Sequence, residues 1–432
     1  MGHGGQSQEL LGLFPPGSAE ADDGMLTIDG CRVDDLADEF GTPVLVVSER
    51  ALRSRAQEYL DGLRARWPAG RVVFASKAFP CTAVQRVMVE EGLGLDVAGA
   101  GEIWTALRAG VAPADVVLHG NAKSGEEIAM AVEHRLGLVV VDNFDDLDRL
   151  EAAVPAGREQ PVLVRVIPGV TADTHAHVLT GHEGSKFGLL PADAARAIAR
   201  IERSARLRMD GLHVHVGSQI LDLEPFVASV AAVAALGEFP VYDLGGGLGV
   251  RYTYADNPPP LADYFDALVG AAREHLPADS TLILEPGRSM VGTAGATVYR
   301  VVTVKRSGDH TFVAVDGGMG DNLEVALFDQ RFEATVANRV GGGQEVTLVG
   351  RHCESGDVLV DPVSLVDPAV GDLVAVPATG AYCYTMSNTY NGARRIPVVF
   401  TQNGAARLVV RRDTWAELMA RDVDAQSGSV LP

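Results

Sequence analysis

The chain has 432 residues, 47% of them hydrophobic and 22% charged, which is typical of a folded protein with more than one domain. Its formal net charge of -21 argues against nucleic acid as a partner, because contact with phosphate backbones requires a basic surface. No apolar run approaches the roughly 18 residues that a membrane span needs, so we expect no membrane partner.

Residues 1–24 contain several glycines together with Pro15 and Pro16, and they lack a basic segment followed by an apolar one. They therefore predict a flexible tail, not a signal peptide. The four cysteines stand without the spacing of a disulfide framework or a metal site: Cys31, Cys81, Cys353 and Cys383. Scattered cysteines favour a reducing compartment, so we expect a cytoplasmic protein.

Between residues 47 and 290, short apolar runs alternate with amphipathic helical patterns. The eight predicted strands are residues 72–76, 95–98, 116–119, 138–142, 162–166, 212–216, 241–244 and 282–285. The helical patterns between them include residues 81–91, 101–108, 126–134, 192–205 and 226–236. Eight alternations of strand and helix predict an α/β domain, a (β/α)8 barrel over residues 47–290.

Beyond residue 290 the pattern changes to short valine-rich segments separated by glycine, aspartate or proline. They predict strands at residues 296–304, 311–315, 345–349, 373–376, 396–400 and 406–410. An early strand at residues 42–47 precedes the barrel, so we expect residues 25–46 and 291–424 to form a mostly β domain. The small, polar residues 425–432 predict a second tail.

Chemically reactive side chains cluster where the predicted barrel strands end, or late within them. They are Lys77, Asp96, His119, His213, His215, Gly245–Gly247, Glu285 and Arg288. Barrel enzymes carry their active sites at this end of the strands, in the loops that lead into the helices. The sequence therefore predicts a catalytic site at the C-terminal face of the barrel.

The residue types in this cluster match the needs of pyridoxal phosphate. Lys77 stands among Ala75, Ala78 and Phe79, an apolar setting that favours the neutral amine required for an imine. Glu285 can keep a ring nitrogen protonated. The loop Gly245–Gly247 lets backbone N–H groups approach a phosphate, although alone it equally fits a tight turn. A dinucleotide site is disfavoured, because its third glycine or alanine would have to stand at Val250.

Two histidine pairs, His213/His215 and His175/His177, raise the question of a metal site. Members of a pair in one strand would face the same side, but no further ligands stand at convincing spacing. We therefore predict no metal. Stacking on a flat ring is the expected role of His215, and His213 is expected to be a buried core residue.

The motifs together resemble the fold type III pyridoxal-phosphate decarboxylases, most closely the diaminopimelate decarboxylases, over residues 40–424. The matching segments are Phe74–Ala78, Leu93–Val97, Gly120–Ser124, Pro168–Val170, Thr174–His175, Thr180–Gly181, Ser185–Leu189, Gly211–Ile220, Glu285–Arg288, Cys353–Asp357 and Gly380–Tyr382. The resemblance implies a barrel of the alanine-racemase type, pyridoxal phosphate as the cofactor, and decarboxylation of an amino acid in lysine biosynthesis.

The resemblance also implies residue roles. Lys77 would carry the cofactor as a Schiff base, His215 would stack on its ring and Glu285 would pair with the ring nitrogen. The other implied cofactor contacts are Asp96, Ser218, Gly245, Gly246, Gly247, Gly287, Arg288 and Tyr382. Cys353 would come from the second subunit of a head-to-tail homodimer and protonate the carbanion left by CO2. The implied substrate contacts are Arg288, Glu324, Phe328, Glu354 and Tyr382.

One segment departs from the family pattern in residues that contact the substrate. Diaminopimelate decarboxylases usually carry arginine, proline, a small residue, leucine and tyrosine where this chain has Glu324–Phe328. A glutamate facing the distal carboxylate of the substrate would be repulsive. We expect either that Arg331 compensates for the replaced arginine or that the substrate differs.

Four hypotheses about activity therefore stand side by side. The first is a diaminopimelate decarboxylase that converts meso-diaminopimelate to L-lysine. The second is a paralogue that decarboxylates another amino acid, a conjugate or a carrier-bound aminoacyl group. An amino-acid racemase is disfavoured, because it needs a second base, usually tyrosine, in the segment of Cys353. A catalytically dead regulatory homologue is disfavoured by the presence of Lys77, His215, Glu285, Arg288 and Cys353.

Overall fold

The computed structural model describes residues 3–169 and 184–423. The chain forms two compact units. One comprises residues 52–250 and 257–290, and the other comprises residues up to 51, residues 251–256 and residues from 291 onward. Among the described residues, none of the helices is both long and apolar enough to cross a membrane.

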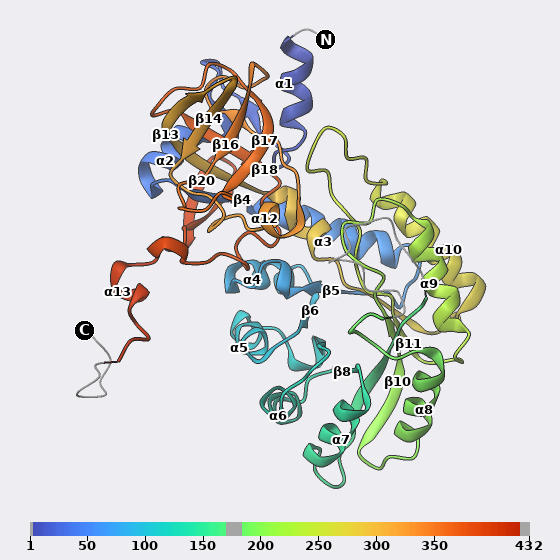
Figure 1. Ribbon diagram of the computed structural model, residues 1–432. Helices are drawn as coiled ribbons and strands as arrows, with labels where there is room; N and C mark the ends of the chain where they lie inside the picture. The colour runs from blue at the N-terminus through green and yellow to red at the C-terminus, as the bar shows by residue number, and fades with distance from the viewer. Residues whose placement is uncertain (1–2, 170–183, 424–432) are drawn as a thin grey trace. The chain divides into compact units, whose positions relative to one another are not determined.

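The first unit is a closed barrel of eight parallel strands, with helices outside them (Figure 1). Its strands are β5 (Arg71–Ala75), β6 (Gly94–Val97), β7 (Val116–Leu118), β8 (Leu138–Val141), β9 (Gln160–Val166), β10 (Leu207–Val214), β11 (Val241–Asp243) and β12 (Thr281–Leu284). Its main helices are α4 (Thr82–Glu90), α5 (Ala100–Ala109), α6 (Gly125–His134), α7 (Phe144–Ala153), α8 (Pro191–Ile201), α9 (Glu224–Ala234) and α10 (Leu261–His275). The predicted (β/α)8 barrel is confirmed, with all eight strands near their expected positions.

Local sequence explains why these elements form. The strands are runs of buried apolar residues, as parallel strands covered on both faces must be. Side chains such as Val73, Val117 and Leu163 meet inside the barrel and fill its interior. Helix α6 begins at a capping box in which Ser124 and Glu127 exchange hydrogen bonds with each other's backbone N–H groups.

The second unit is built on a sheet whose central strands are β13 (Gly295–Ser307) and β4 (Val44–Ser48). The strand order is β17-β16-β14-β13-β4-β19-β20, and β18 pairs with β13 and β15. The remaining bounds are β14 (His310–Val315), β15 (Thr335–Val336), β16 (Gln344–Val349), β17 (Val358–Leu365), β18 (Leu373–Pro377), β19 (Val398–Gln402) and β20 (Ala405–Val410). The mostly β character expected for this part is confirmed, and the early strand β4 lies within its sheet.

Two features of this unit differ from the expectation. Strand β17 lacks a predicted counterpart because Pro362 interrupts its pattern, and the strand lies at the sheet edge, where proline is tolerated. The loose tail expected over residues 1–24 is wrong for its described part. Helix α1 spans His3–Leu11, and Leu10, Leu13 and Phe14 are buried in the hydrophobic core of this unit. Burial of these apolar side chains offsets the low helix propensity of the glycines.

Candidate functional site

The predicted site residues of the barrel lie at the C-terminal ends of its strands. Lys77 sits in the 3-10 turn Ser76–Ala78 directly after β5, and its side chain is exposed. Asp96 lies in β6, and His119 follows β7. Glu285 follows β12, whose neighbours in the barrel are β11 and β5. Residues far apart in the sequence therefore meet at one end of the barrel.

Glu285 is the centre of a buried charged cluster and is only 5% exposed. Its Oε1 lies 2.6 Å from Nε2 of His119, and its Oε2 lies 3.2 Å from Nε2 of His213. Burial alone would raise the pKa of Glu285, but the two histidines hold that pKa well below its usual range. The site therefore carries a permanent carboxylate in a place closed to water.

The two histidines of this cluster respond differently to burial. Burial lowers the pKa of His213 to about 3, so this ring is neutral at physiological pH. For His119, the attraction of Glu285 and Asp96 outweighs burial and raises the pKa. His119 thus holds a proton more strongly than His213 does. The sequence suggested a plain core residue for His213 and no role for His119.

Asp96 lies beside the same cluster and is buried. Its Oδ1 is 3.7 Å from Nε2 of His119. Burial, helped by the charge of Glu285, raises the pKa of Asp96 to about 6, while His119 and Lys77 act in the opposite direction. Asp96 can therefore exchange a proton near neutral pH, which the ion-paired Glu285 cannot.

His215 is oriented by the loop that follows β11. The backbone N–H of Gly246 donates to Nδ1 of His215 at 3.3 Å. Burial, together with Lys77 and Arg165, holds the pKa of His215 well below its usual range. A neutral imidazole whose position is set by a backbone contact suits stacking on a flat ring.

The glycine loop has no room for side chains. A Cβ atom on Gly246 would lie 2.1 Å from the backbone oxygen of Glu285, and one on Gly247 would lie 2.5 Å from that of Gly217. Gly245 and Gly247 also have positive φ angles of 68° and 117°. The loop is therefore a turn without side chains at the C-terminal end of the barrel strands. A backbone of this kind can bind an anion through its N–H groups.

Arg288 and Ser218 also contact each other at this end of the barrel. Nε of Arg288 lies 3.3 Å from Oγ of Ser218, to which it donates. Gly287 packs closely, because a Cβ atom there would lie 3.1 Å from Cβ of Ala75. The arginine is almost fully buried, so it offers a fixed positive charge.

Two buried polar residues of the barrel were missed by the sequence reasoning. Arg165 of β9 lies 3.8 Å from Oδ2 of Asp142, and burial lowers the pKa of its guanidinium despite the surrounding acids. Asp243 ends β11 and is fully buried. Each was treated as part of an apolar strand. A charged residue inside such a strand is itself a sign of a functional site.

Imidazole nitrogens and carboxylate oxygens also bind divalent cations. Such groups come together here from His119, His213, Asp243 and Glu285. Their nearest ligand atoms all lie within 4.8 Å of one another. The expectation of no metal stays a prediction. The pair His175/His177 and the motif residues Val170, Thr174, Thr180 and Gly181 lie outside the described residues.

The remaining predicted site residues belong to the β-rich unit. Cys353 is exposed, as is Glu354 beside it, and the Cys353 N–H donates to Oδ1 of Asn391 at 2.7 Å. The turn that contains them is closed by a contact between His352 and Asp357, in which Nδ1 of His352 lies 2.9 Å from Oδ2 of Asp357. Tyr382 is partly buried and has a positive φ of 62°, an uncommon backbone conformation for tyrosine.

Glu324 begins helix α12 (Glu324–Phe328) and is only 1% exposed. The hydroxyl of Tyr252 donates to its Oε2 at 3.4 Å. A carboxylate thus occupies a buried position in the segment where the resemblance led us to expect arginine, while Phe328 is partly buried.

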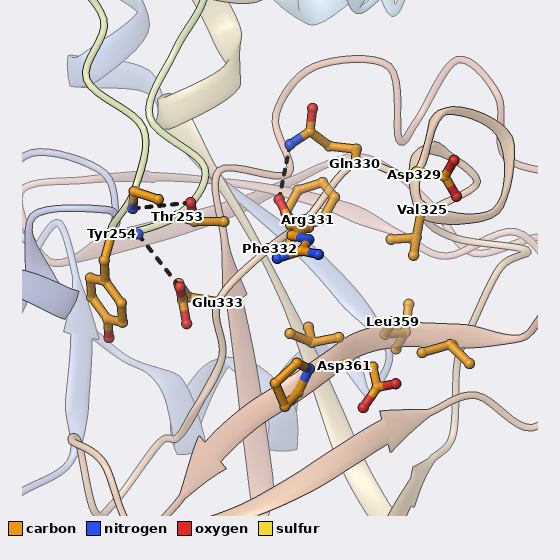
Figure 2. A pocket seen from close by; sticks show the side chains of 14 residues that line it. Thr253, Tyr254, Val325, Asp329, Gln330, Arg331, Phe332, Glu333, Leu359 and Asp361 are labelled. Atoms are coloured by element: carbon orange, nitrogen blue, oxygen red, sulfur yellow. Dashed lines mark hydrogen bonds between the residues drawn. The ribbon is translucent and has the colours of Figure 1, made fainter. Parts of the chain in front are cut away.

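Arg331 lies in a separate pocket of about 550 Å³ in the same unit. Figure 2 shows Arg331, Phe332 and Glu333 across this pocket from Leu359 and Asp361 of β17. Glu324 is absent from the residues that line it. The expectation that Arg331 compensates for the replaced arginine stays a prediction.

Comparisons with known proteins agree on one family. Residues 50–292 match the family model for the pyridoxal binding domain of pyridoxal-dependent decarboxylases. The chain is 40% identical to diaminopimelate decarboxylase of Bacillus subtilis, over 94% of this chain and 97% of that protein. It is 41% identical to the diaminopimelate decarboxylase of Actinosynnema pretiosum, with 98% of both chains covered.

A solved structure is similar over nearly the same length. It is diaminopimelate decarboxylase from M. jannaschii in complex with L-lysine. The TM-score is 0.88 and the sequence identity 30%, with 96% of this chain and 99% of that chain covered.

Proposed function

We infer the reaction from one premise: the chain belongs to the family of pyridoxal-dependent decarboxylases, among the diaminopimelate decarboxylases. It is a carboxy-lyase whose cofactor is pyridoxal phosphate. We propose that it converts meso-diaminopimelate to L-lysine and CO2. The observation that carries this proposal is the identity of 40% and 41% with two diaminopimelate decarboxylases over nearly the whole chain. The buried Glu285, at the end of the barrel where Lys77 is exposed, supports the cofactor.

The residues at this end of the barrel fit the cofactor. The glycine loop packs against neighbouring backbone too closely for side chains, which leaves its backbone N–H groups uncovered by side chains of its own, and Arg288 adds a fixed positive charge, so both suit a phosphate. Glu285 suits a protonated ring nitrogen, and the neutral His215 suits the ring face. Lys77 supplies the amine.

Bound pyridoxal phosphate supplies a ring that accepts the electron pair left when CO2 departs. We propose that the amine of Lys77 would hold the cofactor at this end of the barrel. Glu285 stays charged and keeps the ring nitrogen protonated, while His215 keeps the ring plane in one orientation. The thiol of Cys353 then delivers a proton to the former carboxylate-bearing carbon, with Glu354 beside it against the substrate.

The buried Glu324 supports a second candidate, a decarboxylase for a different amino acid or for a conjugated or carrier-bound one. A carboxylate near the distal end of diaminopimelate would repel its distal carboxylate, whereas it would attract a distal ammonium group. The carboxylate of Glu324 is held by Tyr252 and is not free to swing into bulk water. The two candidates therefore differ in whether the substrate must carry a carboxylate beside its distal ammonium group.

The experiment that decides between them is CO2 release by the cofactor-loaded enzyme. The panel is meso-diaminopimelate, with lysine, ornithine and arginine in both enantiomers. We expect release from meso-diaminopimelate, at least about a hundredfold faster in kcat/KM than from any other member, because a distal carboxylate is a strong determinant. Release from a basic amino acid alone would replace the first candidate with the second. No release from any member would direct the search to conjugates.

We propose that two copies of the chain share each active site. The exposure of Cys353 and Glu354 supports this, because a proton-donating thiol must be shielded from water by something outside its own unit. In a symmetric head-to-tail dimer, each site would combine Lys77 of one copy with Cys353 and Glu354 of the other.

Mixing two inactive variants tests the shared site. Lys77→Ala and Cys353→Ala should each lose activity alone. After dissociation and reassociation together, about a quarter of wild-type activity should return, since half the dimers are mixed and each has one intact site. A mixture that stays inactive, with mixed dimers verified by mass, would mean that Lys77 and Cys353 act within one chain.

We also propose a cytoplasmic location. The four cysteines, all of which lie within the described residues, are not joined in disulfides, as expected of a protein from a reducing compartment.

A further inference from the structure

Asp243 links two parts of the site that the sequence reasoning left separate. It is the last residue of β11 and is 0% exposed. Its Oδ1 accepts a hydrogen bond from the backbone N–H of Gly245 at 3.0 Å, at the start of the glycine loop. Directly after the neighbouring strand β12, the N–H of Glu285 donates to the backbone oxygen of Gly245 at 2.8 Å. Hydrogen bonds to residues at the ends of β11 and β12 thus hold the glycine loop in place.

Asp243 also lies close to Glu285. Its ligand oxygen lies within 4.8 Å of those of Glu285, His119 and His213, and no hydrogen-bond donor within the described part of the chain reaches Oδ2. Two buried carboxyl groups this close repel each other when both are charged, which favours one proton shared by the pair. Glu285 has the two histidines close by, whereas Asp243 has a single backbone N–H. The proton therefore belongs to Asp243.

The surrounding charges agree with this assignment. The titratable and charged groups around Asp243 come from other strands or their ends: Asp96, His119, Arg165, His213 and Glu285. Burial, followed by the charge of Glu285, raises the pKa of Asp243 well above its usual range. The pKa of Glu285 moves the opposite way, as expected when two coupled carboxyl groups hold one proton.

We propose that Asp243 is a positioning residue of the cofactor site, a neutral carboxylic acid that donates its proton to Glu285 and anchors Gly245. One side chain then holds both the charged group beneath the ring nitrogen and the backbone loop that receives the phosphate. The inference rests on the proposed function, because Glu285 and the glycine loop are its proposed cofactor contacts.

A matched pair of substitutions tests the proposal. An asparagine can copy a neutral acid, since its N–H2 donates and its oxygen accepts, whereas alanine removes both contacts. We expect Asp243→Asn to keep the cofactor dissociation constant and kcat within about threefold of wild type, and Asp243→Ala to weaken cofactor binding about tenfold or more. If Asp243 were a charged group, the asparagine variant would fail like the alanine variant, and the proposal would be overturned.

Infrared spectroscopy reads the proton directly, without substrate turnover. At about pH 8, where an ordinary aspartate is fully ionised, the wild-type enzyme should show the carbonyl stretch of a protonated carboxylic acid, and Asp243→Asn should lack it. Asp210→Asn, which changes an aspartate paired with Arg208 within β10, should keep the band.

Two results would contradict the assignment even if Asp243→Ala fails to fold. One is an absent acid band in the wild-type enzyme. The other is a stoichiometric metal ion in the purified wild-type enzyme that is missing from Asp243→Asn, because the four groups would then be ligands. A wrong substrate proposal would leave both the band and the cofactor affinities unchanged, so the two failures are distinguishable.

Discussion

Replacing Lys77 by alanine is expected to lower kcat/KM by at least about a thousandfold, because the covalent attachment of the cofactor and the proton transfers of its amine are lost together. The structure offers no replacement amine in the same turn, since the flanking residues Ser76 and Ala78 are small and buried. The near-visible absorbance of the lysine-bound cofactor should disappear with the activity.

The matched control for this variant is Lys305→Ala. Lys305 is exposed on β13 in the β-rich unit, so its substitution removes the same charge without altering a residue of the barrel. Its turnover and absorbance should equal those of the wild type within error. Turnover by Lys77→Ala at more than a few per cent of the wild-type rate would show that another group carries the cofactor.

Replacing Glu285 by glutamine is expected to lower kcat by about a hundredfold to a thousandfold, because the neutral amide cannot keep the ring nitrogen protonated. The shape of the side chain is kept, so cofactor affinity should change much less than kcat. The sign of the pH effect follows from the lowered pKa of Glu285. The carboxylate stays charged well below pH 4.5, the ordinary value of the group, so acidification through neutral pH should not imitate the variant.

The measurement is kcat and the cofactor dissociation constant for Glu285→Gln at several pH values, beside Glu274→Gln as the control. Glu274 is exposed on helix α10 and faces no part of the cluster around Glu285. Equal losses in cofactor affinity and kcat would mean that Glu285 only holds the cofactor. A wild-type rate that falls as a single carboxyl group is protonated near its ordinary pKa would also contradict the assignment.

Much of the fold could be predicted because its information is local. The period of the apolar residues and the turn residues between them locate eight strands of the barrel, including β9 despite its internal Arg165. The errors also have local causes. Helix α1 is glycine-rich and gains its order from Leu10, Leu13 and Phe14 in the core of its unit. Strand β17 contains Pro362, which usually argues against a strand.

The site divides in the same way. Lys77, Glu285 and the glycine loop could be named from the sequence, because they follow strands whose ends must meet at one face of a parallel barrel. Asp243 and His119 could not be assigned, since their importance lies in which side chains they meet. Glu285 is 72 residues from His213 in the sequence, yet their side chains are 3.2 Å apart.

The sequence by itself determined the architecture, the kinds of reactive group and the strand ends that carry them, because spacing and residue type act within a few neighbours. Only the tertiary structure decided the protonation states. Burial lowers the pKa of His213, whereas neighbouring carboxylates raise that of His119, and the pKa values of Glu285 and Asp243 move in opposite directions. Those differences arise from burial and from charges on strands distant in the chain, and neither exists until the barrel has closed.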